Sequence, residues 1–149
     1  MSNYAVTGQL AAVTSSYKTA ARITGGTGGR TRIYDLLLGA SSTPADNTLV
    51  WALMRHTVAP TDTAVTPTAL DPADVASRAA AGENATIEGT VTAGSELLEL
   101  PLHQRASYRW IASPGGELVI PATASNGISA RAKSAAYTGA AETTIHFNE

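Results

Sequence analysis

The sequence has 149 residues, with 10 basic and 12 acidic side chains, three histidines and no cysteine. That length suits a single domain, and a formal net charge of −2 gives no electrostatic basis for binding a nucleic-acid backbone. The lack of cysteine excludes disulfides, a thiolate metal site and a cysteine nucleophile. No apolar run approaches the roughly 20 residues of a membrane-spanning helix. Alanine and threonine outnumber large apolar residues, so we expect a folded domain with a thin core that depends partly on neighbouring chains.

The apolar runs are short, rich in residues that favour strands and separated by turn residues, which is typical of an all-β protein. In the strand expected at 48–56, Trp51 shares one face with other apolar residues, so we expect Trp51 in the core. In chain order we predict strands at 4–10, 19–24, 32–38, 48–56, 85–92, 96–102, 106–112, 117–120, 128–133 and 143–147.

The middle of the chain has a different composition. Residues 59–72 hold three prolines and several threonines, which predicts an extended loop. Asp71 as a cap and Pro72 at the first helical position precede an alanine-rich stretch to Ala81, which Gly82 ends. This pattern predicts one short helix of about two turns.

Nine or ten strands, with turn signals about every 8–12 residues, predict a two-sheet β-sandwich of jelly-roll type. An immunoglobulin-like topology is the alternative. We expect residues 1–149 to form one domain with at most one short helix. Residues 1–30 either pack as strands or form an arm that becomes ordered only on assembly.

No pattern in the sequence predicts a catalytic residue, a cofactor site or a metal ligand. The glycine-rich stretch at 25–29 leads into a strand and not a helix, so it predicts a turn or loop and not a phosphate-binding loop. His56, His103 and His146 are far apart in sequence, and we expect them to be solvated near strand ends.

The segment QRASYRW at 104–110 mixes basic and aromatic residues. Alternation places Arg105 and Arg109 on one face and Tyr108 and Trp110 on the other. A stacking platform for nucleic acid needs aromatic and basic groups on one exposed face. We therefore expect the aromatic rings in the core and the arginines in solvent or at an interface.

Several segments resemble one group of proteins. They are YDLLLG at 34–39 and TPADN at 43–47, which lead to Trp51 and Arg55, then QRASYRW, PGGEL at 114–118, PA at 121–122 and NGI at 126–128. Together they are similar to small tailed-bacteriophage virion proteins of about this length, namely head decoration, cement or minor capsid proteins with a β-sandwich or jelly-roll body. The resemblance covers most of residues 32–147.

The resemblance implies a non-enzymatic virion protein, made in the host cytoplasm, which binds the major capsid protein lattice and bridges its subunits without cofactor, nucleic acid or membrane. We expect a homo-oligomer, with a trimer favoured, and interface roles for Arg55, Arg105 and Arg109. The alternative is a tail or baseplate component, or a receptor-binding module that recognises carbohydrate. Location in the head or in the tail stays open.

Overall fold

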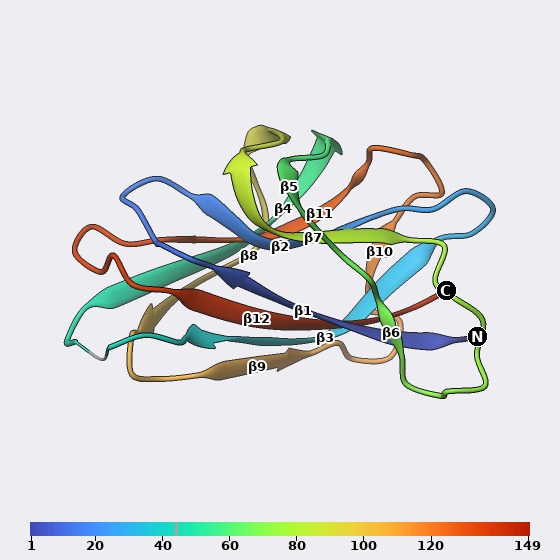
Figure 1. Ribbon diagram of the computed structural model, residues 1–149, viewed down its shortest axis with the longest axis horizontal. Coiled ribbons are helices and arrows are strands. Elements are labelled where there is room, and N and C mark those ends of the chain that lie inside the picture. Colours follow the sequence, from blue (N-terminus) through green and yellow to red (C-terminus); the bar gives the residue numbers. More distant parts are fainter. Residues whose placement is uncertain (44) are drawn as a thin grey trace.

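Two six-stranded antiparallel sheets pack face to face in the computed structural model, which describes residues 1–43 and 45–149 (Figure 1). Sheet A has the strand order β10-β3-β12-β1-β6, and β9 also pairs with β3. Sheet B has the order β5-β7-β2-β11-β4-β8. The strands of sheet A are β1 (Asn3–Leu10), β3 (Thr31–Ala40), β6 (Thr68–Ala69), β9 (Tyr108–Ile111), β10 (Leu118–Ile120) and β12 (Ala141–Asn148). The strands of sheet B are β2 (Lys18–Thr24), β4 (Thr48–Val58), β5 (Thr61–Val65), β7 (Ala80–Ile87), β8 (Thr90–His103) and β11 (Gly127–Lys133).

The predicted two-sheet β-sandwich is confirmed. The described residues form twelve strands and no helix, against the nine or ten strands predicted. Residues 1–30 supply β1, which lies between β12 and β6, and β2, which lies between β7 and β11.

The core fills the space between the sheets with side chains that alternate along the strands. Alternation in the strand expected at 143–147 predicts Ile145 and Phe147 on the inward face, and both are fully buried on β12. Phe147 stacks on Tyr4 of β1, with 5.4 Å between the ring centroids. Trp51 of β4 is also fully buried, which confirms its predicted place in the core.

The helix predicted between Asp71 and Ala81 is wrong. Asp71 does begin a turn, since its side chain accepts a hydrogen bond from the backbone N–H of Ala73 and its carbonyl accepts one from Asp74. However, Ala80 and Ala81 belong to β7 and pair with β2. Strand pairing with β2, together with burial of Ala81, outweighs the helix propensity of alanine here.

The loop predicted at 59–72 also needs correction, since it contains β5 and β6. Farther along the chain, the two strands predicted at 85–92 and 96–102 are divided differently. Glu88 and Gly89 form a short connection between β7 and β8, and β8 continues as one long edge strand. Its pairing with β4 shifts register between Leu53 and Val58, so the edge is irregular there.

Part of sheet B curls over its own outer face. Residues 58–62 and 85–95, which we call the arch, rise from the sheet at the top of Figure 1. At Asn84 the backbone of β7 has a φ of 51°, a turn-like conformation that helps the strand leave the sheet. The arch thus turns the centre of sheet B into a layer with both faces covered.

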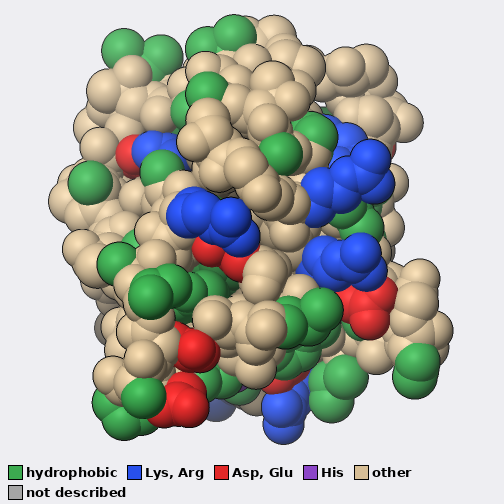
Figure 2. All heavy atoms as spheres, turned by 90° about the vertical axis from the view of Figure 1, so that its right-hand side faces the viewer, with side chains coloured by type: hydrophobic (Ala, Val, Ile, Leu, Met, Phe, Trp, Pro, Cys, Tyr) green, Lys and Arg blue, Asp and Glu red, His purple; other side chains and the backbone are tan. Residues whose placement is uncertain are grey.

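Both chain termini lie at the same end of the sandwich, on the right of Figure 1. We call this the terminal end, and Figure 2 views the molecule from this side. The loop at 25–30, the segment at 70–79 and the ends of β4 and β10 also belong to it, as their mutual contacts show.

Replacing Trp51 by alanine is expected to lower the free energy of unfolding by about 3–5 kcal/mol, because it removes a fully buried aromatic ring and leaves a cavity. Denaturant unfolding followed by circular dichroism measures this loss. The control is Ile111→Ala, whose side chain is 61% exposed and should change stability by no more than about 0.5 kcal/mol. Equal effects of the two substitutions would contradict the assignment of Trp51 to the core.

Candidate functional site

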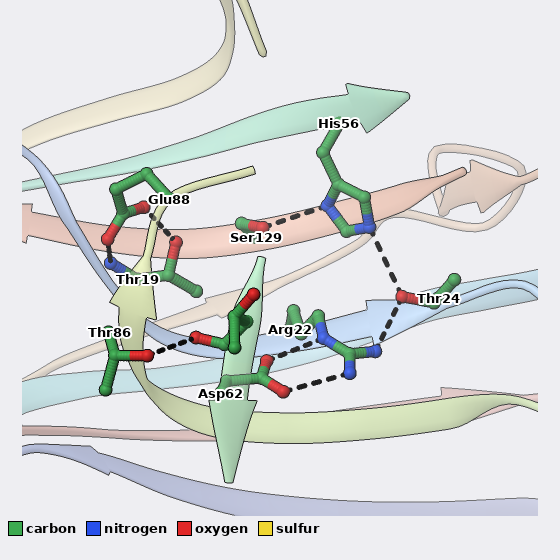
Figure 3. Close-up of polar contacts among 9 residues, drawn as sticks. Thr19, Arg22, Thr24, His56, Asp62, Thr86, Glu88 and Ser129 are labelled. Carbon is green, nitrogen blue, oxygen red and sulfur yellow. Dashed lines mark hydrogen bonds and ion pairs between the residues drawn. The ribbon is translucent and has the colours of Figure 1, made fainter. Parts of the chain in front are cut away.

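A layer of polar side chains lies buried between sheet B and the arch (Figure 3). Alternation along 128–133 predicts Ile128, Ala130 and Ala132 on the core side and Ser129, Arg131 and Lys133 in solvent. The first three are buried as predicted, but Ser129 and Arg131 are buried as well. The alternation was therefore read correctly, while the assignment of one face to solvent was wrong. The arch covers that face, and strand periodicity alone contains no information about such a cover.

His56 of β4 lies at the centre of this layer and is 1% exposed, so its predicted solvation is wrong. Its Nδ1 is 2.9 Å from the Ser129 hydroxyl, and its Nε2 is 3.2 Å from the Thr24 hydroxyl. Gly127 of β11 leaves room for the ring, since a Cβ there would lie 2.5 Å from Nε2. Burial, with a further contribution from the charge of Arg22, lowers the pKa of His56 from 6.5 to about 4.

Two ion pairs near His56 hold the strands and the arch together. Arg22 of β2 donates two hydrogen bonds to Asp62 of β5, from Nε at 2.6 Å and from Nη2 at 3.0 Å. At the tip of the arch, Glu88 accepts hydrogen bonds from the backbone N–H and the hydroxyl of Thr19, at 2.9 and 2.6 Å. Glu88 also pairs with Arg131 at 3.3 Å. No sequence pattern indicated these partners, because 40 or more residues separate each pair.

The Ser129–His56 pair has the residue types of a nucleophile and a general base. A reactive pair needs access to substrate and a third group that orients the histidine. Here both side chains are buried, and the other ring nitrogen of His56 faces Thr24 and not a carboxylate. The geometry therefore supports a structural role, in which the layer satisfies hydrogen bonds and fixes the arch.

A second polar cluster lies on the outer face of sheet A. Arg109 of β9 donates to both carboxylate oxygens of Asp35 on β3, at 3.0 and 2.7 Å. His146 of β12 places Nδ1 2.9 Å from the same carboxylate, and Tyr34 stacks on its ring. Hydrogen bonding to Arg109 is the main reason why the pKa of Asp35 is lowered. The carboxylate thus crosslinks three strands.

The arginines predicted at an interface lie in different places. Arg55 donates from Nη1 to the carbonyl of Val119 on β10 at 2.7 Å and so links the two sheets at the terminal end. Arg105, between β8 and β9, pairs with exposed Asp46 at 3.1 Å at the opposite end. Arg109 lies in the Asp35 cluster with a largely exposed side chain. The three do not form one site, and their interface role stays a prediction.

The aromatic residues beside Arg109 follow the prediction only in part. Trp110 packs against the core from the edge of sheet A and remains half-buried. Tyr108 is 38% exposed, so its predicted place in the core is wrong. Both side chains lie on β9, a four-residue strand at the free edge of the sheet. This edge position explains their incomplete burial.

The carboxylate of Glu149 anchors the segment at 70–79. It accepts hydrogen bonds from the backbone N–H groups of Arg78 at 2.9 Å and Ala79 at 2.7 Å, and from the hydroxyl of Ser77 at 3.1 Å. The side chain of Glu149 is 5% exposed. This carboxylate fixes the segment against the end of β12, and the Tyr4 hydroxyl adds a hydrogen bond to the Val75 carbonyl at 2.9 Å.

Comparison with protein-family models, curated proteins and solved structures found no match. Within residues 1–43 and 45–149, no group of three or more His, Cys, Asp or Glu side chains is placed to hold a metal ion. The same described residues include no helix long and apolar enough to cross a membrane.

The stability of the protein is expected to fall between pH 6.5 and pH 4 because of His56. Above pH 6.5 the ring is neutral in the folded and unfolded chains. At lower pH the unfolded chain takes up a proton that the folded chain excludes until about pH 4. The free energy of unfolding is therefore lower at pH 4 than above pH 6.5 by about 3 kcal/mol.

Titration of the histidine ring resonances by NMR measures this pKa directly. The control variant is His103→Gln, which removes a half-exposed histidine outside the polar layer and leaves His56 in place. A pKa of 6 or more for His56 would contradict the buried, neutral assignment.

Replacing Glu149 by alanine is expected to speed amide hydrogen exchange at Arg78 and Ala79 by about 10- to 100-fold, as loss of charge-assisted hydrogen bonds implies. Exchange followed by mass spectrometry or NMR tests this effect. In the control, Glu142→Ala removes an exposed carboxylate and should leave these amides unchanged. Unchanged exchange in the Glu149 variant would show that other contacts hold the segment.

Proposed function

We propose that the chain is a non-enzymatic structural protein of a phage particle, which binds the outer capsid lattice and bridges neighbouring major capsid subunits. The observation that carries the proposal is the pinning of its exposed loops. Glu149 fixes the segment at 70–79, and on the opposite end Gln104 accepts a hydrogen bond from the backbone N–H of Ala45 and donates one to the carbonyl of Thr43. Loops held in place before contact lose little conformational entropy when they bind.

The stabilising mechanism follows from mass action. A protein that binds assembled shells and not free subunits adds its binding free energy to the assembled state. When many copies bind a repeating lattice, contacts that are individually weak together stabilise the shell strongly. The resemblance of residues 32–147 to small virion proteins supports this reading, and so does the β-sandwich body.

Shells assembled from the major capsid protein encoded in the same genome provide the test. The purified chain is expected to sediment with these shells, saturate at hundreds of copies each and raise the temperature at which they disrupt. Unassembled capsid protein is the control and should not bind. Absence of binding, or saturation at a few tens of copies, would contradict the decoration role.

A second candidate function is a receptor-binding module that recognises carbohydrate. It is favoured by an open hollow of about 510 Å³ at the end opposite the termini. Asp46, Asn47 and Lys133 line this hollow, and the ammonium of Lys133 lies 4.1 Å from the ring centre of Tyr17. Specific binding on a glycan panel, lost in Asp46→Asn, would support this candidate over the capsid role.

A further inference from the structure

Four exposed arginines gather at the terminal end. Arg30 ends the glycine-rich loop, and Arg32 lies two residues on, at the start of β3. Arg55 reaches the same corner from sheet B, and Arg78 comes from the segment before β7. We call this set the arginine face. It holds four of the ten basic side chains of a protein whose net charge is −2.

Contacts to the backbone link these arginines in two pairs. Arg32 pairs with Val119 of β10, whose carbonyl accepts the hydrogen bond from Arg55. On the other side, Arg78 donates from Nη1 to the carbonyl of Gly28 at 3.3 Å, two residues before Arg30. Figure 2 shows basic groups across the middle and right of this end, with acidic groups beneath some of them.

Two of the four guanidinium groups are held in place while part of each stays free. Arg55 uses Nη1 to bind the Val119 carbonyl. Arg78 lies across Gly29, where a Cβ would come 2.7 Å from Nη2, and its Nε is 3.7 Å from the Glu149 carboxylate. A guanidinium fixed through one N–H group presents the others in a preset direction. That arrangement suits a planar anionic acceptor.

Acidic side chains lie beside the basic ones at this end in Figure 2, and some of them are already engaged by the backbone. Glu149 is 5% exposed, and its carboxylate is occupied by the backbone of the segment at 70–79. Asp71 binds the backbone N–H of Ala73, and Asp74 lies on the same segment. Neither Asp71 nor Asp74 forms an ion pair with Arg30, Arg32 or Arg55 among the described residues.

We propose that the arginine face is a docking surface for a carboxylate-rich patch of a partner protein. Charge complementarity carries this choice, because guanidinium groups match carboxylates in geometry as well as in sign. A nucleic acid fits less well, since the chain is acidic overall and the exposed aromatic Tyr108 lies on β9, outside the four-arginine set. The proposal goes beyond the capsid role, because it holds for any acidic partner.

The test uses a fluorescein-labelled peptide of ten glutamates as the probe, with binding followed by fluorescence anisotropy. We expect binding that weakens as the salt concentration rises from 50 to 300 mM, because surface ion pairs are screened. The double variant R30E/R32E should lose at least tenfold in affinity. The control K18E/R105E makes the same change in net charge away from the arginine face and should lose less than twofold.

Three results would overturn the proposal: no binding of the probe, an equal loss in the control, or tighter binding of a single-stranded oligonucleotide of twenty thymidines. Arg30 and Arg32 are exposed, so circular dichroism should show that R30E/R32E is folded. If it is not folded, R30Q/R32Q takes its place in the binding experiment. Shell binding separates this proposal from the capsid role. If R30E/R32E loses the probe but binds shells as well as the unchanged protein, the capsid role stands and the arginine face binds an acidic partner other than the shell.

Discussion

The polar layer beneath the arch is the constraint on which the rest of the structure depends, because it allows sheet B to bury both of its faces. A strand covered on both sides is normally apolar on both. β11 instead presents Ser129 and Arg131 to the covered side. A buried charge without a partner is strongly destabilising, so each such group must be matched. Arg22 with Asp62 and Arg131 with Glu88 meet this demand and fix where the arch can lie.

Those pairs also explain how far the sequence could predict the fold. Period-two alternation is a local property, and it was sufficient for β4, β11 and β12 and for the two-sheet architecture. Contacts between distant segments decide the rest. Ala80 and Ala81 join β7 because β2 lies beside them, and an alanine-rich sequence does not reveal that neighbour.

The same limit applied to the candidate sites. His56 looked like a solvated histidine near a strand end, since the arch that buries it comes from residues far along the chain. Arg109 was singled out because arginines are common at interfaces, but its partner Asp35 is 74 residues away. Sequence patterns thus identified residue types worth examining and gave no pairings. Only the register of β9 against β3 places these two side chains together.

The irregular edge of β8 has a consequence for behaviour in solution. A long, regular edge strand invites another strand to pair with it, which leads to aggregation. β8 spans fourteen residues but shifts register repeatedly against β4, and Pro101 has no N–H to donate. Copies held at high local concentration are therefore discouraged from merging into a continuous sheet. The fold can tolerate crowding without polymerising through its longest free edge.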